Sequence, residues 1–376
     1  MAAKSWTLFN QTTNEHLGYQ KICEHAEFSV HKSGLSAGVE MVTINNGAMQ
    51  IHVLPTRGMS IWRASCGEEI IQWQSPIRGP VHPSFVPVSE PSGIGWLDGF
   101  DELLVRCGLE SNGAPEHDPE TGRLIYPVHG RIGNKPAYKV QLSIDGDQIK
   151  LTGWVEETRF HLFKVRLKTT LTTTLNSSSF DIEDEITNLS ASPAEIQILY
   201  HTNFGLPLLD ANSHFVAPIK ELVPRNEHAA SGINGWDRYA EPTAGFEEQV
   251  YFATLQADEL GTSQVMLKNS DASRAAVLRF NTKQLPCFTL WKNTTAVEDG
   301  YVTGLEPGTN YPNPRTYEGA QGRIVKLAGN ATTTFSLGFD YCTDTSEVQT
   351  AESVVKNLQA SPPKIHDKPL DGWCAP

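Results

Sequence analysis

The sequence contains no long apolar run and few cysteines. Nowhere do 18 or more apolar residues follow one another, so the chain has no candidate transmembrane helix. The N-terminal residues include one lysine but no apolar segment of the kind found in signal peptides. Six cysteines lie far apart among 376 residues with no Cys-x-x-Cys pair, which argues against a disulfide framework and a zinc ribbon. We therefore expect a cytoplasmic protein with reduced thiols.

Basic residues are also scarce. The chain has 30 Lys+Arg against 43 Asp+Glu, a formal net charge of −13 at pH 7, and no cluster of basic residues. Nucleic-acid and membrane-surface binders need clustered Lys and Arg to meet phosphate groups. The composition therefore predicts no nucleic-acid and no membrane partner, and we expect a small-molecule ligand and a monomer or homodimer.

Helical periodicity is rare, whereas strand periodicity is strong. Apolar and polar residues alternate over 138–144, 149–155, 164–175 and 180–186, the pattern of strands with one buried face. Asp145-Gly146-Asp147 separates the first two as a hairpin turn. Shorter strands are expected at 38–45, 49–53, 60–64, 69–73, 196–200, 250–254, 264–268, 276–282, 287–292, 301–305, 322–327 and 333–342. Strands at this spacing, without intervening helices, predict an antiparallel sandwich or barrel.

The arrangement of these segments predicts one all-β domain over 1–376, with few short helices. One helix is expected at 345–359, followed by an irregular tail that ends the chain at 376. Two long stretches, 76–128 and 203–248, show no strand periodicity and are rich in Gly, Pro, Trp and Asp. Because long loops in a compact domain usually serve a site, we expect these two to cover a pocket.

Short motifs along the chain carry a family resemblance. In order, they are Pro55-Thr56-Arg57-Gly58, Cys107-Gly108-Leu109, His129-Gly130-Arg131, Tyr200-His201-Thr202-Asn203-Phe204-Gly205 and Leu305-Glu306-Pro307. Their order and spacing resemble the aldose 1-epimerase (galactose mutarotase-like) superfamily, in particular its DUF4432 branch, over about residues 40 to 342.

This resemblance implies a large antiparallel β-supersandwich that binds a sugar on its concave face. It also implies that His201 is a general acid, that Glu306 is a general base, and that His129 contacts the sugar beside the acid. Arg131, on the same strand face as His129, is a candidate to bind a hydroxyl or a carboxylate. The implied activity is an isomerase of the aldose 1-epimerase type, with no cofactor and no metal.

Two positions depart from the family pattern. Arg106 precedes the Cys-Gly-Leu motif where the branch has a small hydroxyl residue, so the shape and charge of the pocket are open. Asn310 stands where classical mutarotases often have histidine, so the sugar contacts there are also open.

The chemistry of anomer interconversion fits a histidine and a glutamate. A base takes the proton of the anomeric hydroxyl while an acid protonates the ring oxygen, and each positioned group typically contributes ~10²–10⁴-fold. The further candidates for sugar binding are Arg57, Asn203 and Trp291. Weaker candidates are Trp96, Phe204 and Tyr311 as apolar platforms and Asp101 as a hydrogen-bonding group.

Each candidate also has a structural interpretation. His201 and His129 are compatible with hydrogen-bonded strand residues, Glu306 with a turn carboxylate, Arg57 with a turn, and the tryptophans with core packing. Three other functions stay open: a metal-dependent β-barrel isomerase using His129, His201 and Glu306, a non-catalytic carbohydrate-binding protein, and an isomerase of a modified or anionic sugar read by Arg106 or Arg131.

Overall fold

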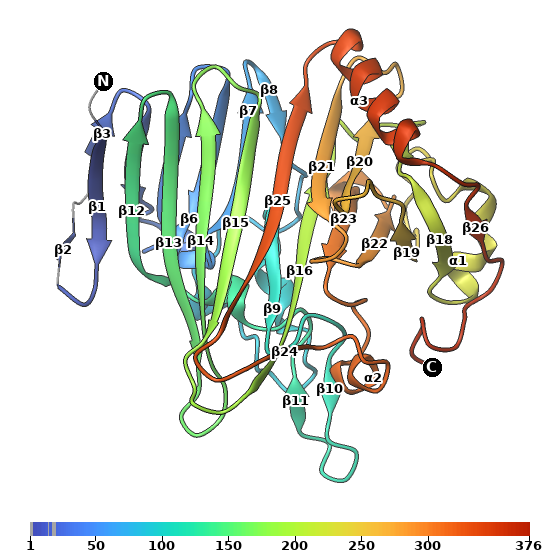
Figure 1. Cartoon of the computed structure of the whole chain (residues 1–376), viewed down its shortest axis with the longest axis horizontal. Coiled ribbons are helices and arrows are strands. Elements are labelled where there is room, and N and C mark those ends of the chain that lie inside the picture. Colours follow the sequence, from blue (N-terminus) through green and yellow to red (C-terminus); the bar gives the residue numbers. More distant parts are fainter. Residues whose placement is uncertain (1–2, 14, 17–19) are drawn as a thin grey trace.

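The protein is described from a computed structural model, which covers residues 3–13, 15–16 and 20–376. A ten-stranded antiparallel sheet forms the front layer in Figure 1. Its spatial order is β17 (His214–Val216), β20 (Thr262–Lys268), β21 (Ala275–Asn281), β25 (Thr332–Cys342), β15 (Ser179–Asn188), β14 (Lys164–Thr174), β13 (Gln148–Thr158), β12 (Ala137–Asp145), β1 (Lys4–Asn10) and β2 (Glu15–His16).

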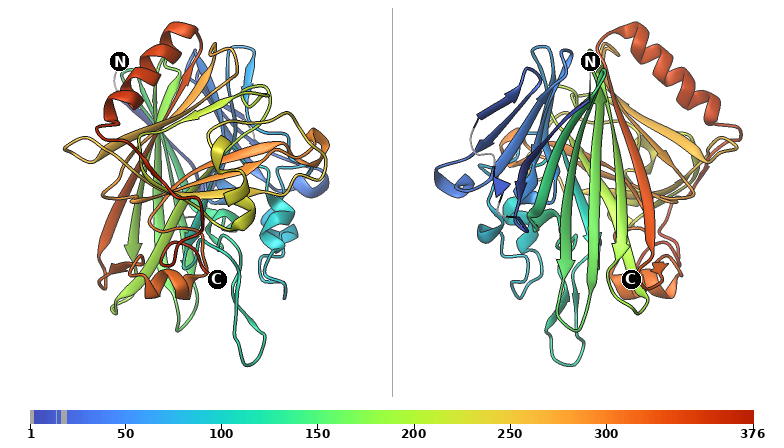
Figure 2. Two further views of the ribbon diagram at one scale, coloured as in Figure 1. Left: turned by 90° about the vertical axis from the view of Figure 1, so that its right-hand side faces the viewer. Right: turned by 60° about the vertical axis from the view of Figure 1, so that its left-hand side comes forward.

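A larger, 14-stranded sheet lies behind the first (Figures 1 and 2). Its main order is β26 (Lys364–Ile365), β18 (Ile219–Pro224), β19 (Gln249–Leu255), β22 (Cys287–Asn293), β23 (Val302–Gly308), β16 (Ala194–Phe204), β9 (Leu104–Leu109), β7 (Ser60–Cys66), β6 (Met49–Leu54), β5 (Glu40–Asn45), β4 (Ala26–Val30) and β3 (Gln20–Cys23), with β24 (Val325–Leu327) beside β16 and β8 (Glu69–Ile71) beside β7. A separate hairpin pairs β10 (Glu116–His117) with β11 (Leu124–Tyr126). The predicted all-β architecture is confirmed.

Helices are few in the described part of the chain: α1 (Glu227–Ser231), α2 (Arg315–Ala320) and α3 (Thr345–Leu358), with short 3-10 turns. Helix α3 corresponds to the predicted helix, and the Asp344 side chain caps it by accepting from the Glu347 amide at 2.9 Å. Val348 and Val355 pack against β20 and β21. None of the described helices has the length and apolar character needed to span a membrane.

The alternation read from the sequence explains how the two sheets join. In β14, every second residue from Val165 to Thr173 is buried, and the residues that alternate with them face outward. The three apolar inward residues, Val165, Leu167 and Leu171, belong to one hydrophobic cluster with members from both sheets. Burying each such side chain contributes about 1.5–3 kcal/mol before the entropic cost of ordering is counted.

Several strands escaped the prediction. β1 was missed because a bulge between Thr7 and Phe9 buries the adjacent Leu8 and Phe9, which breaks the alternation. β3, β4, β9, β17 and β18 were also missed, the last three inside or beside the stretches expected to be irregular. β9 is buried at every position and therefore shows no alternation.

A buried ion pair connects the two sheets. Arg106 of β9 pairs with Asp184 of β15 and also donates to Thr169 at 2.6 Å and to the Met59 carbonyl at 3.1 Å. The Tyr200 hydroxyl donates to the same Asp184 carboxylate at 2.8 Å. Every polar nitrogen of the Arg106 side chain thus has a partner between the sheets, so this arginine serves the packing of the two sheets.

A second buried carboxyl group supports β9. Glu157 of β13 accepts a hydrogen bond from the Leu109 amide at 2.8 Å, and its other oxygen has no hydrogen-bond partner among the described residues. Burial raises the pKa of Glu157 from 4.5 to about 7. The folded state therefore holds a proton that the unfolded chain releases.

This linkage predicts a pH-dependent stability. Because the folded pKa is raised, the stabilisation is present below about pH 4.5 and is lost as the pH rises through about 7. Relative to wild type, Glu157→Gln should gain about 2–3 kcal/mol in free energy of unfolding between pH 5 and pH 8. Urea denaturation of both proteins at the two pH values measures this, and an unchanged difference would contradict it.

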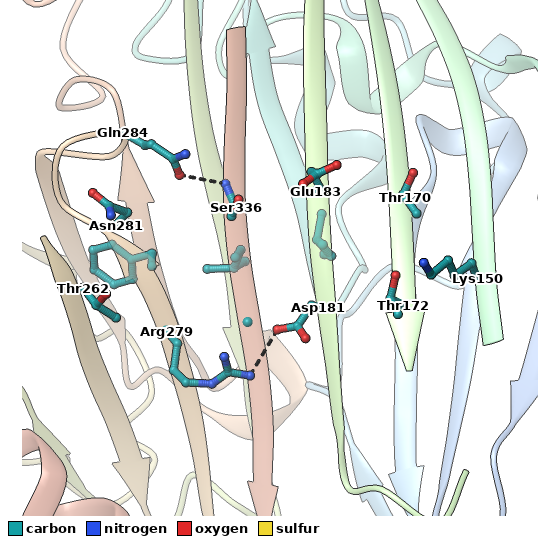
Figure 3. A pocket seen from close by; sticks show the side chains of 14 residues that line it. Lys150, Thr170, Thr172, Asp181, Glu183, Thr262, Arg279, Asn281, Gln284 and Ser336 are labelled. Atoms are coloured by element: carbon teal, nitrogen blue, oxygen red, sulfur yellow. Dashed lines mark hydrogen bonds and ion pairs between the residues drawn. The ribbon is translucent and has the colours of Figure 1, made fainter. Parts of the chain in front are cut away.

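The outer face of the ten-stranded sheet has a shallow hollow of about 540 Å³, drawn in Figure 3. It forms around Gly338, where an added Cβ would lie 2.5 Å from Cζ of Arg279. Arg279 pairs with Asp181 at 3.2 Å, and Gln284 accepts from the Ser336 amide at 3.1 Å. Its polar side chains are those of a solvated sheet face, and its lining contains no histidine.

Candidate active site

Strand β16 presents its side chains alternately to two different environments. Its nine residues from Ile196 to Phe204 are all buried. Ile198, Tyr200 and other even-numbered members pack in the core between the sheets. His201 faces the other way, toward a group of aromatic residues on the far side of the larger sheet.

Glu306 reaches His201 from the neighbouring strand β23. The antiparallel register aligns Thr202 with Leu305, so His201 and Glu306 lie directly opposite each other on the two strands. Oε1 of Glu306 is 3.2 Å from Nε2 of His201. Gly304 makes room for this approach, because an added Cβ there would lie 2.4 Å from the same Oε1 and 3.1 Å from Cε1 of His201.

The pair is almost completely buried, and burial determines its protonation. Desolvation, with the negative charge of Glu248 as a smaller cause, raises the pKa of Glu306 well above its usual value. Desolvation, with His129 as a smaller cause, lowers the pKa of His201 well below its usual value. Between these limits the pair holds one proton, which either Oε1 or Nε2 can carry, and it has no net charge.

Oε1 of Glu306 has no hydrogen-bond partner among the described residues, because its approach to His201 does not have hydrogen-bond geometry. A buried carboxyl oxygen left without a partner is costly, so it needs a ligand or a water molecule. This oxygen therefore marks the site where a hydroxyl group would bind.

His129 is the second histidine of the site. Its backbone has a φ of 56°, which turns the chain sharply before Gly130. Its Nδ1 donates to the Asn112 carbonyl at 3.1 Å, which leaves Nε2 for other contacts. The ring lies 5.3 Å from that of His201 and 4.7 Å from that of Trp96, measured between centroids.

Aromatic rings cover the two histidines and enclose a cavity of about 250 Å³. Phe100 lies 5.2 Å and Trp291 5.4 Å from the His201 ring. The complete lining is Trp96, Leu97, Phe100, Ala114, Pro115, Val128, His129, His201, Arg225, Glu248, Val250, Thr289, Trp291, Glu306 and Pro312. Most of these come from the stretches 76–128 and 203–248 or from β19, β22 and β23, so the two irregular stretches do contribute walls to a pocket.

Polar groups at the rim complete the lining. Arg225 and Glu248 form an ion pair at 3.3 Å, and both are half exposed. Trp291 donates from its indole nitrogen to Glu248 at 2.7 Å, which fixes the ring against the cavity. Deeper, the Thr289 hydroxyl is buried without a hydrogen-bond partner among the described residues and also lines the cavity.

Of the seven residues selected from the sequence, the structure brings His201, Glu306, His129 and Trp291 together in this cavity. Arg57 lies outside it, fully buried in an ion pair with Glu102. Arg131 pairs with Glu110 at 3.1 Å, and Asn203 lies behind His201.

The weaker candidates divide in the same way. Trp96 lines the cavity. Phe204 packs in the core, Tyr311 stacks between Phe252 and Trp373, and Asp101 accepts from Trp62 at 2.9 Å. Asn310 exchanges amide hydrogen bonds of 2.8 and 2.9 Å with Asn112, whose carbonyl holds His129. Asn310 thus acts on the site indirectly.

Ten of the 15 lining residues were not selected from the sequence, among them Phe100, Arg225, Glu248 and Thr289. Arg225 and Glu248 meet only because β18 and β19 pair antiparallel and bring the two ends together. The single available signal was that both fall in or at the end of an unpatterned stretch. Neither spacing nor composition distinguished them from other surface charges.

A metal centre was one of the alternatives. Across residues 3–13, 15–16 and 20–376, no three His, Cys, Asp or Glu side chains are grouped so that they could hold a metal ion.

Comparison with known proteins agrees with the fold. The sequence matches the family described as "Domain of unknown function (DUF4432)" over residues 36–340. The chain belongs to this DUF4432 family. A search of curated proteins gives no match.

Solved structures place the DUF4432 chain among mutarotase-like folds. A candidate aldose 1-epimerase from Klebsiella pneumoniae is 34% identical, with 98% of this chain and 99% of that one covered at a TM-score of 0.93. A galactose mutarotase-like protein from Clostridium acetobutylicum is 12% identical, with coverages of 85% and 99% and a TM-score of 0.58. Galactose 1-epimerase from Lactobacillus acidophilus is 12% identical, with coverages of 84% and 98% and a TM-score of 0.56. The predicted galactose mutarotase-like sandwich is confirmed.

Proposed function

We propose that this DUF4432 protein is an isomerase of the aldose 1-epimerase type, which interconverts the anomers of a free sugar by general acid–base catalysis. His201 is the acid that protonates the ring oxygen, and Glu306 is the base at the C1 hydroxyl. The observation that carries the proposal is the buried, unpartnered Glu306 Oε1 placed 3.2 Å from His201 Nε2 at the wall of a cavity.

The separation of the two groups suits the reaction. The anomeric hydroxyl oxygen and the ring oxygen are bonded to the same carbon, so they lie side by side in any cyclic aldose. A neighbouring carboxylate and imidazole can therefore each reach one of them at hydrogen-bond distance, about 2.6–3.2 Å. Removing the hydroxyl proton and protonating the ring oxygen opens the ring, the aldehyde rotates, and reversal of both transfers closes it on the other face.

The shared proton also fits this chemistry. Moving it from Glu306 to His201 produces a carboxylate and an imidazolium, the two forms that the first step requires. After ring opening Glu306 has gained a proton and His201 has lost one, so the pair again has one proton in total. Closing on the opposite face returns it, and no external proton donor is needed.

The cavity supports an uncharged monosaccharide as the substrate. Its volume of about 250 Å³ is slightly below the ~300–1,000 Å³ of typical ligand pockets, so it suits a single ring. An anionic sugar was an alternative because Arg106 or Arg131 could bind its charge. Neither arginine lines the cavity. Arg225 does, but Glu248 neutralises it.

The remaining lining groups have defined roles in this proposal. Trp291 and Trp96 provide apolar faces for the C–H groups of the sugar, and His129 Nε2 and the Thr289 hydroxyl bind hydroxyl groups. The Arg225–Glu248 pair has both donors and acceptors, which suits a pair of adjacent hydroxyls.

Saturation-transfer NMR tests the function directly. One anomeric resonance is irradiated in the presence of the protein, and the decrease in intensity of the other anomeric resonance is measured. The experiment is repeated across a panel of aldoses, uronates and deoxysugars. We expect acceleration with at least one uncharged aldose. Absence of acceleration with every sugar, together with tight binding of one of them, would instead support a carbohydrate-binding protein.

Glu248 offers a test through pH. The alkaline limit of kcat/KM should report the loss of the single proton, and the charge of Glu248 helps to raise the pKa of Glu306 that sets this limit. In Glu248→Gln the negative charge is lost while the acceptor for Trp291 is kept, so the alkaline limb should move to lower pH. Glu247→Gln, at the exposed neighbour, is the control. Equal profiles for both variants would contradict the proposed proton sharing.

A further inference from the structure

Asn203 contacts the proposed acid on the side away from Glu306. It follows His201 by two residues on β16, so both side chains project from the same face of the strand. Its Oδ1 lies 2.6 Å from Nδ1 of His201. Asn203 is completely buried and is absent from the cavity lining, so it touches the histidine rather than a ligand.

The orientation of the Asn203 amide is determined by its other contacts. Its Nδ2 donates to the Glu102 carbonyl at 3.0 Å and to the His201 carbonyl at 3.3 Å. Carbonyl oxygens only accept hydrogen bonds, so the amide nitrogen must face them and Oδ1 must face the ring. The reverse orientation would place two carbonyl oxygens against an amide oxygen.

This orientation decides the tautomer of His201. Because Oδ1 only accepts, Nδ1 of the imidazole must carry a hydrogen. A neutral imidazole has one hydrogen, so Nε2, which lies 3.2 Å from Glu306 Oε1, is left with a lone pair that can accept a proton. Nε2 is therefore the nitrogen that gains and loses the mobile proton.

Asn203 is itself held by buried groups. The Glu102 carbonyl accepts from Asn203 and also from the Trp73 indole nitrogen at 3.0 Å. The Glu102 carboxylate pairs with Arg57, which also donates to the Gly99 carbonyl at 2.9 Å and the Val81 carbonyl at 3.0 Å. Arg57 thus anchors the segment that positions Asn203.

We propose that Asn203 is a positioning residue that fixes His201 in the Nδ1–H tautomer, so that Nε2 exchanges its proton with Glu306, and that Arg57 and Glu102 hold Asn203 in place. The catalytic part of this inference rests on the proposed function. The tautomer itself is a property of the folded protein without substrate.

The other groups around His201 do not set this tautomer. Glu306 faces Nε2, and His129 lies ring to ring at 5.3 Å with its own Nδ1 bound to a carbonyl. Trp96, Phe100 and Trp291 contribute ring contacts, and the charged pair Arg225 and Glu248 lies at the cavity rim. Among the described residues, Asn203 is the hydrogen-bonding partner of Nδ1.

The tautomer is measured by long-range ¹H–¹⁵N correlation spectra of the full chain labelled with ¹⁵N-histidine, with His201 assigned through the missing signals of His201→Asn. In wild type we expect a protonated Nδ1 at every pH at which the protein is folded. An unprotonated Nδ1 beside a protonated Nε2 would overturn the proposal. This spectrum needs no sugar, so it separates failure of this inference from failure of the proposed function.

Two variants connect the tautomer to turnover. Asn203→Leu removes the acceptor and should lower kcat by at least ~10-fold with little change in KM, because tautomer and orientation are lost while the cavity is kept. Asn203→Asp keeps an acceptor facing Nδ1 and should retain the tautomer. Asn188→Ala, at a buried asparagine of β15 that donates to the carbonyls of Ser192, Leu327 and Ala328, controls for lost stability.

The outcomes are distinct. If Asn203→Leu keeps wild-type kcat and the Nδ1–H tautomer, the proposal is wrong. If Asn203→Leu does not fold, the wild-type spectrum and the Asn203→Asp variant still decide it, because loss of the Nδ1 proton in either would contradict it.

Discussion

Replacing Glu306 by glutamine should reduce kcat for anomer interconversion at least ~10²-fold. Glutamine fills the same volume but takes up no proton, so the C1 hydroxyl loses its base. KM should change little, because the amide still offers an oxygen to that hydroxyl. The measurement is the exchange rate in saturation-transfer NMR with the best sugar of the panel.

Glu157→Gln is the matched control for this variant. It makes the same substitution at a glutamate that is equally buried but supports β9 outside the cavity. We expect wild-type kcat for it under conditions where both proteins are folded. Full activity of Glu306→Gln would remove Glu306 from the mechanism.

Replacing His201 by asparagine should have a comparable effect, again at least ~10²-fold in kcat. The ring oxygen then has no acid, and Glu306 has no partner with which to share a proton. Because the two residues act as a unit, the double variant should be scarcely slower than the more impaired single variant. Multiplicative losses in the double variant would indicate that the two groups work independently.

His52→Asn controls for the loss of a histidine as such. His52 bonds to Thr43 at 3.1 Å and Gln50 at 3.1 Å on strands β5 and β6, outside the cavity. We expect this variant to turn over like wild type. Wild-type turnover by His201→Asn would exclude His201 as the acid.

Strands β12 to β15 of the ten-stranded sheet were predictable because their two faces differ. In β14 the outward face is polar and the inward face apolar, so the period of two is visible in the sequence. β9 and most of β16 are buried on both faces, so alternation there is weak or absent. These are also the strands beside the site, which is why its local structure was the harder part to predict.

The polar site residues were predictable only where a motif marked them. His129, His201 and Glu306 come from three distant segments, and the motifs identified them without showing that they touch. Arg57 belongs to the same set of motifs but lies outside the cavity, where its guanidinium forms a buried ion pair with Glu102. A motif shows that a residue type recurs; whether its side chain faces the ligand or supports one that does depends on tertiary packing.

The charge of the cavity was not predictable from composition. The net charge of −13 predicts no polyanion partner, but it does not describe a pocket of 15 residues. Arg106 pairs with Asp184, Arg131 with Glu110 and Arg225 with Glu248, so each of these arginines contacts a carboxylate.

The most direct test compares anomer exchange in wild type and in the His201→Asn/Glu306→Gln double variant. The sugar that responds best in the panel is used at equal protein concentrations, with buffer alone as the reference. We predict an exchange rate in wild type that rises in proportion to protein concentration, and a rate in the double variant close to that of buffer. Equal rates in the two proteins, whether both fast or both at the buffer level, would contradict the account.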